Sequence, residues 1–191
     1  MEKYDNAIIG YIFECFNIDE ETGKIYHKLD RPKEHFKKES CYKRWKSTYA
    51  GKEAGSKVFY NKSGEYYIQM YVNGRLYQGH IIAYAMYHNK WPKNVIDHIN
   101  GDTLDNRKEN IRDVSVSLNI CNSKMYSNNT SGRVGIWFHN KNKNWVAEGK
   151  SNGVKHRLGS YPTKEQAIAA RQEWEDVVGC FTERHGKRLD K

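Results

Sequence analysis

The stretch VIDHINGDTLDNRKENIR, residues 95–112, followed by LNICN at residues 118–122, concentrates histidine, carboxylate and amide side chains. Its apolar start, Val95–Ile99, predicts a short strand that ends at a turn over residues 100–102. Adjacent residues of a strand point to opposite faces. Asp97 and His98 can therefore converge on one substrate group only if the strand ends there, as the turn predicts.

The flanking sequence predicts the elements around this corner. Tyr66–Val72 and Arg75–Gly79, joined by Asn73-Gly74, have the pattern of a β-hairpin with a type I′ turn. Ile81–His88 predicts a helix that ends before Trp91-Pro92. Ser115–Lys124 predicts a second helix, with Ser115 as its N-cap.

Composition limits the class of protein. The 191 residues carry 32 basic and 23 acidic side chains, a net charge of +9, and 13% are aromatic. No apolar run reaches the roughly 18–20 residues of a membrane span, and the N-terminus has no signal-peptide pattern. The four cysteines are too widely spaced for a C-x-x-C zinc site or a small disulfide framework. We expect a folded cytoplasmic protein with a polyanion as its partner.

The C-terminal third has its own pattern. After a polar linker at residues 126–133, three strands are predicted at Gly135–His139, Trp145–Lys150 and Lys155–Tyr161. A capping box at Thr163–Gln166 begins a helix whose apolar stripe is predicted to consist of Ala167, Ala170, Trp174 and Val177. Ser131–Tyr161 has six basic residues and one acid, whereas Thr163–Val178 has two basic residues and four acids. A basic sheet backed by an acidic helix is expected.

The first 57 residues are the least informative. Phe13–Ile18 and Ile25–Lys28, separated by a turn at Glu20–Gly23, predict a hairpin. No structure is assigned to Lys33–Lys57, and the role of this region is open.

The 95–122 stretch resembles the HNH nucleases, specifically their phage and intron-borne homing branch. The matching residues are Asp97-His98, Asn110 twelve positions beyond His98, and Asn119 twenty-two beyond Asp97. The resemblance implies that His98 is the general base, that Asp97 and Asn119 bind one divalent metal ion, and that Asn110 clamps the loop that orients His98. A histidine with a pKa of about 6.5 suits proton abstraction, and oxygen ligands suit a hard cation.

Four further assignments stay open. The namesake motif ends in a helical histidine where this chain has Asn119, and an amide oxygen favours Mg²⁺, with Mn²⁺ as the alternative. Asn122, one helical turn on, is the other candidate for the second ligand. Arg112 is a candidate phosphate contact, and His80 either packs at a helix start or lies near the site.

The C-terminal third resembles the DNA-binding domain of plant ethylene-response factors, through SGRVGIW at 131–137, WVAE at 145–148 and RLGSY at 157–161. That resemblance implies a three-stranded sheet in the DNA major groove with a helix behind it. The candidate DNA contacts are Trp137, Lys143, Lys150, Lys155 and Arg157. Trp137 stands where the plant domains usually have an arginine, so base specificity does not transfer.

The sequence thus predicts an α+β protein: a ββα-metal nuclease core at 58–125, the linker, a DNA-binding module at 134–179 and a basic tail at 180–191. The predicted function is metal-dependent, site-preferring cleavage of double-stranded DNA by a monomer on an asymmetric site, one strand being nicked per binding event. The alternatives are a non-catalytic DNA-binding regulator and a structure-specific phage repair or packaging nuclease.

Overall fold

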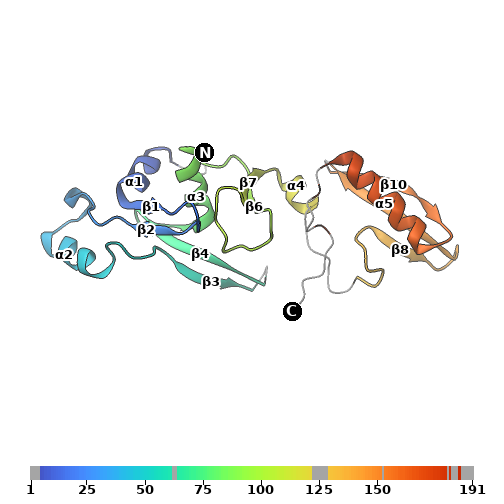
Figure 1. The fold of residues 1–191 in the computed structure, drawn as a ribbon, viewed down its shortest axis with the longest axis horizontal. Coiled ribbons are helices and arrows are strands. Elements are labelled where there is room, and N and C mark those ends of the chain that lie inside the picture. Colours follow the sequence, from blue (N-terminus) through green and yellow to red (C-terminus); the bar gives the residue numbers. More distant parts are fainter. Residues whose placement is uncertain are drawn as a thin grey trace. The chain divides into compact units, whose positions relative to one another are not determined.

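The computed structural model describes residues 5–61, 64–121, 129–151, 153–179, 181 and 185. It forms two compact units, Met1–Asp113 and Val114–Lys191 (Figure 1). Several predictions fall wholly or largely outside the described residues: the end of the helix beyond Cys121, Asn122, the start of the linker, Asn152 and most of the tail. Within the described ranges, no helix has the length and apolar character needed to cross a membrane.

The first unit begins with helix α1, Ala7–Cys15, followed by the antiparallel strands β1, Phe16–Ile18, and β2, Ile25–His27. The predicted hairpin is confirmed from Phe16 onward, but the prediction of strand at 13–15 is wrong because this segment is the last turn of α1. Ile8, Ile12 and Cys15 recur at helical spacing and are all buried.

The segment to which no structure was assigned holds a 3₁₀ turn at Lys33–His35, helix α2 at Glu39–Thr48 and strand β3 at Ser56–Tyr60. Trp45 is the buried residue of α2. A helix with one buried side chain has no apolar stripe, so hydrophobic periodicity gave no signal for it.

Strands β3, β4 (Glu65–Val72) and β5 (Arg75–Gln78) form an antiparallel sheet. Asn73 and Gly74 have φ angles of 47° and 76°, as a type I′ turn requires, which confirms that prediction. Helix α3, Gly79–His88, follows directly and confirms the predicted helix.

One hydrophobic core joins the N-terminal region to the segment that follows it. Its members come from α1, β1 and β2 before residue 57, and from β4, β5 and α3 after it. The largest of its fully buried side chains are Ile12, Ile82, Val72 and Cys15. The expected boundary between residues 57 and 58 thus lies inside the first unit.

Two short strands complete this unit. β6, Val95–His98, pairs with β7, Ile111–Val114, which the sequence did not reveal. Helix α4, Val116–Cys121, then begins where predicted, and Ser115 Oγ accepts a hydrogen bond from the Leu118 amide at 3.2 Å. The predicted N-cap is confirmed.

The second unit contains the three predicted strands, β8 (Ile136–His139), β9 (Asn144–Ser151) and β10 (Val154–Tyr161), in an antiparallel sheet with β9 in the centre. Helix α5, Lys164–Val178, packs on this sheet, and the capping box between Thr163 and Gln166 is present. Sheet and helix make the predicted arrangement of three strands and one helix.

The predicted apolar stripe of α5 is wrong at its end, since Val177 is 85% exposed. The buried residues of the helix are Ala167, Arg171 and Glu175, one turn apart. Arg171 donates to Glu175 at 2.6 Å and to the Glu148 carbonyl oxygen at 2.6 Å, so a polar pair occupies the inward face. Hydrophobic spacing alone could not reveal a buried ion pair.

Candidate active site and nucleic-acid interface

His98 lies at the end of β6, where the strand passes into a tight turn. The Gly101 amide donates to the His98 carbonyl oxygen at 3.0 Å, and Gly101 has a φ of 82°, which glycine adopts without strain. Asp97 and His98 are 3% and 4% exposed. The predicted strand end is confirmed, and it places an imidazole and a carboxylate side by side in the chain in a largely dehydrated setting.

A single hydrogen bond sets the tautomer of His98. Its Nε2 lies 3.1 Å from the Asn106 Oδ1, and Asn106 is itself buried. An amide oxygen only accepts hydrogen bonds, so Nε2 carries the proton of the neutral ring. Nδ1 is then the atom with a lone pair and can accept a proton. Among the residues that the structure describes, the side-chain hydrogen bond of the His98 ring is the one from Nε2 to Asn106.

Asn110 holds the loop between the two strands closed. Its Oδ1 accepts from the Asn100 amide at 2.9 Å, and its Nδ2 donates to the Asp105 carbonyl oxygen at 2.7 Å. These are backbone hydrogen bonds across the loop, of the kind expected of Asn110. They hold Asn100, at the start of the loop, and Asp105, in its middle, together. Asp105 precedes Asn106, the residue that hydrogen-bonds His98.

His80, the second residue of α3, packs edge-on against His98, with ring centroids 5.2 Å apart. It is buried, and this burial, with a smaller contribution from His98, lowers its pKa to about 3. His80 therefore stays neutral at working pH. The two interpretations of His80 from the sequence are compatible, because it packs at the start of a helix and also lies beside His98.

Burial is also the main cause of a lowered pKa at His98, because removing the imidazolium from water is unfavourable. The hydrogen bond to Asn106 and the nearby Asp97, Asp102 and Asp105 carboxylates act in the opposite direction. The balance keeps His98 neutral at pH 7, the state that a proton acceptor needs.

The candidate metal ligand Asp97 is engaged by Arg112. Arg112 donates to Asp97 Oδ2 from Nη2 at 2.8 Å and from Nε at 3.1 Å, reaching across from β7 to β6. The sequence suggested a phosphate contact for Arg112. The structure instead shows a carboxylate partner for it, and the phosphate contact stays a prediction.

The oxygen donors that were expected to bind a metal ion belong to different units. Asp97 lies in the first unit, and Asn119 is a half-buried residue of α4 in the second. In the described ranges, no group of three or more His, Cys, Asp or Glu side chains could hold a metal ion. A carboxylate and an amide oxygen are a smaller set, but both are hard donors that suit Mg²⁺, which keeps most of its water ligands.

Asn106 is the site residue whose role the sequence did not reveal. The turn of the N-terminal hairpin packs against its backbone: a Cβ on Gly23 would lie 2.4 Å from the Asn106 carbonyl carbon and from the Arg107 nitrogen. Gly23 also has a φ of 69°. The signal for Asn106 in the sequence was its place at an intermediate position of the pattern that resembles the HNH nucleases, eight residues after His98.

Replacing Asn106 with alanine is expected to leave DNA binding intact and to lower the cleavage rate about tenfold, because the imidazole loses the acceptor that fixes its tautomer. The same hydrogen bond raises the pKa of His98, so its loss should also move the acid limb of the pH–rate profile to lower pH. Single-turnover rates across pH would show both effects. A slower enzyme with an unchanged profile would indicate a purely structural role.

Four of the five candidate DNA contacts of the second unit share one face of its sheet. A Cβ on Gly149 would lie 2.6 Å from the Trp174 ring of α5, so Ala147 and Gly149 face the helix. Their neighbours on β9, Glu148 and Lys150, face away from it. The cross-strand partners of these two residues, Arg157 and Lys155, share that face, and so does Trp137, which is opposite Val146.

These candidates are accessible. Trp137 is 41% exposed, and Lys150, Lys155 and Arg157 are exposed. Lys155 forms an ion pair with Glu148 at 3.1 Å. Lys143 lies in the exposed β8–β9 turn with a φ of 54°. The sheet therefore presents an indole and several cations on the side opposite α5.

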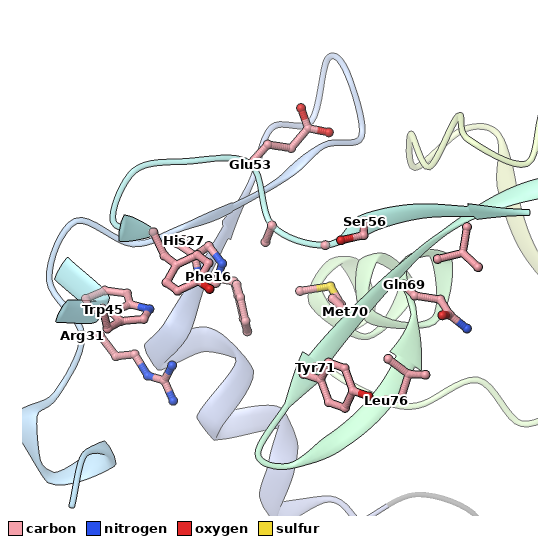
Figure 2. A pocket seen from close by; sticks show the side chains of 14 residues that line it. Phe16, His27, Arg31, Trp45, Glu53, Ser56, Gln69, Met70, Tyr71 and Leu76 are labelled. Carbon is pink, nitrogen blue, oxygen red and sulfur yellow. The ribbon is translucent and has the colours of Figure 1, made fainter. Parts of the chain in front are cut away.

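A separate cavity of about 490 Å³ lies elsewhere in the first unit, between α2 and the β4–β5 hairpin (Figure 2). Aromatic and aliphatic side chains dominate its lining, including Phe16, Trp45, Tyr71 and Leu76. None of the candidate catalytic or metal-binding residues contributes to it.

Residues 70–119 match the family model described as HNH endonuclease. The matched range includes Asp97, His98, Asn110 and Asn119, and it crosses the boundary between the two units. The match supports an HNH nuclease, an enzyme that hydrolyses DNA. No curated protein and no solved structure matches the chain.

Proposed function

We propose that this protein is a metal-dependent, site-preferring DNA endonuclease of the homing type. The observation that carries the proposal is the arrangement at His98. A buried imidazole is oriented through Nε2 by Asn106, has its Nδ1 available as a base, and follows directly on a buried carboxylate in a segment that matches HNH endonucleases.

In the proposed reaction, His98 Nδ1 accepts a proton from the water that attacks the phosphorus atom, a step typically worth about 10² to 10⁴ in rate. Asn106 keeps the proton on Nε2, and Asn110 holds the loop that carries Asn106. Asp97 and Asn119 would hold a divalent cation, whose charge would stabilise the anionic transition state. In the structure Arg112 is paired with Asp97, so it would compete with the cation for this carboxylate.

The pH dependence of cleavage follows from the state of His98. The base must be neutral, so the rate should rise with pH through the pKa of His98 and then level off. Because burial lowers this pKa, the midpoint should lie below the usual value of about 6.5. Single-turnover rates between about pH 5 and 8 would test this. A midpoint above pH 7 would contradict His98 as the buried general base.

We further propose that the β8–β10 face reads double-stranded DNA. The support is its exposed Trp137 and Arg157, the cations beside them, and the acidic helix on the opposite side. Lysines would mainly neutralise phosphates, whereas Arg157 or Trp137 could contact base edges. One such face and one His98 per chain favour a monomer on an asymmetric site that nicks one strand.

Incubation with supercoiled plasmid, with Mg²⁺ or with chelator, tests the proposed function. Nicked circles that form only with Mg²⁺ are expected. Linear product at one enzyme per site would contradict nicking.

The Asp97–Arg112 ion pair favours a second candidate, a non-catalytic DNA-binding regulator, because it neutralises the carboxylate that should bind metal. Binding without cleavage under Mg²⁺ and Mn²⁺ would support that alternative.

A further inference from the structure

Positive charge in the N-terminal region is concentrated in one segment. Residues 31–52 hold eight basic and two acidic side chains, a net charge of +6. Residues 1–30 hold three basic and seven acidic side chains, a net charge of −4. The small net charge of the first 57 residues as a whole therefore hides a strongly cationic part that contains α2.

Most of these cations are exposed and have no carboxylate partner. Two of them form ion pairs: Lys33 with Glu39 at 3.5 Å and Lys46 with Asp30 at 2.7 Å. The exposed side chains without an ion pair to any residue that the structure describes are Lys37, Lys38, Lys43, Arg44 and Lys52. Like charges gathered in this way repel one another and favour an anionic partner.

The segment is held in place by aromatic packing that leaves the charges outside. Trp45, 8% exposed, anchors α2. Its ring centroid lies 5.5 Å from that of Phe36 and 6.2 Å from that of His27. Figure 2 shows Trp45 and Arg31 beside His27, across the cavity from Tyr71 and Leu76. The exposed cations are thus carried by a fixed element.

The position of α2 indicates what it could contact. Figure 1 shows α2 at one end of the first unit, away from the β6–β7 pair, with β3 and β4 running along the unit. Any DNA that occupies His98 would reach α2 only by extending along the unit. Phosphates in the flanking duplex, rather than the scissile phosphate, fit the basic segment.

We propose that α2 and its flanking residues 37–52 bind the phosphate backbone of duplex DNA outside the catalytic site. The nuclease unit would then carry its own DNA anchor, distinct from the sheet of the second unit. This inference rests on the proposed function, in which duplex DNA is the substrate. Because the contacts are to phosphates, they add affinity and do not choose a sequence.

The test uses the full-length chain with Lys43→Gln/Arg44→Gln. The control, Lys90→Gln/Lys93→Gln, removes the same charge from exposed positions after α3. Affinity for a mixed-sequence duplex is measured with chelator present at several salt concentrations. Each lost phosphate contact makes the negative slope of log K against log salt shallower by about 0.9. With two contacts removed, the slope of the variant should be shallower by about 1.8, and the variant should bind at least about tenfold more weakly in 0.1 M salt.

An unchanged slope and affinity for the variant would overturn the anchor, and so would an equal loss in the control. Thermal unfolding checks that each variant is folded. If Lys43→Gln/Arg44→Gln is destabilised, Lys37→Gln/Lys38→Gln, in the segment that enters α2, decides the question by the same measurement. Plasmid cleavage by the wild type is scored separately, so failure of the nuclease proposal shows as missing cleavage with binding intact.

Discussion

Replacing His98 with alanine is expected to slow DNA cleavage by a factor of about 10² to 10⁴ while the affinity for duplex DNA stays within about threefold of the wild type. The imidazole is the proton acceptor for the attacking water in the proposed reaction. It is 4% exposed, so it can add little to the surface that holds the DNA. Single-turnover cleavage of plasmid with Mg²⁺ measures the rate, and duplex binding with chelator measures the affinity.

His88→Ala is the matched control, because His88 is an exposed histidine of the same unit, at the end of α3. Its removal should leave both the rate and the affinity unchanged. A His98→Ala variant that cleaves at the rate of the wild type would contradict the assignment of the base. Loss of binding and cleavage together, with a lowered unfolding temperature, would show that His98 is needed for the fold.

The double variant Trp137→Ala/Arg157→Ala is expected to abolish most of the site preference while unspecific nicking continues. Both residues lie on the sheet face opposite α5, and a good base contact is worth about 1 to 3 kcal/mol of discrimination. We therefore expect the ratio of cleavage at the preferred site to cleavage elsewhere to fall at least about tenfold. Mapping of nicks along phage and plasmid DNA gives this ratio.

Lys164→Ala is its control, because it removes the same charge from α5, on the other side of the sheet. It should leave the preference intact. If the double variant still chooses the same site with the same ratio, this face is not the DNA-reading surface. Equal weakening at all sites would limit its role to phosphate contacts.

Local signals account for what the sequence could predict. The Asn73-Gly74 turn, the Ser115 cap and the Thr163–Gln166 capping box each depend on neighbouring residues, and all three are present. Strand β7 has no such signal. It pairs with β6 across the loop between the two strands, so its strand conformation depends on contacts that are distant in the sequence.

The same distinction holds at the candidate site. The order and spacing of Asp97, His98 and Asn110 indicated the chemistry, and the loop hydrogen bonds of Asn110 agree with its predicted role. The partners of these residues could not be predicted, because they depend on how the loop folds. Asn106 hydrogen-bonds His98 only once the loop is folded, and Arg112 on β7 hydrogen-bonds Asp97 on β6.

The N-terminal region illustrates a further limit. Hydrophobic spacing did not indicate α2, because one tryptophan surrounded by aromatic rings replaces an apolar stripe. The contact of Gly23 with the loop that carries Asn106 was equally invisible. The shared hydrophobic core ties residues 1–57 to the segment that follows them, and the Gly23 contact ties them to the loop beside His98.

The most direct test of the account is the position of a bound metal ion in a crystal of the protein with Mn²⁺ and duplex DNA, located by anomalous scattering. We expect one cation at about 2.1 Å from an Asp97 carboxylate oxygen, with Arg112 displaced from that oxygen and the His98 Nδ1 within reach of a water on the scissile phosphate. A cation bound elsewhere, with Arg112 still on Asp97 in a crystal whose DNA is cleaved, would contradict it.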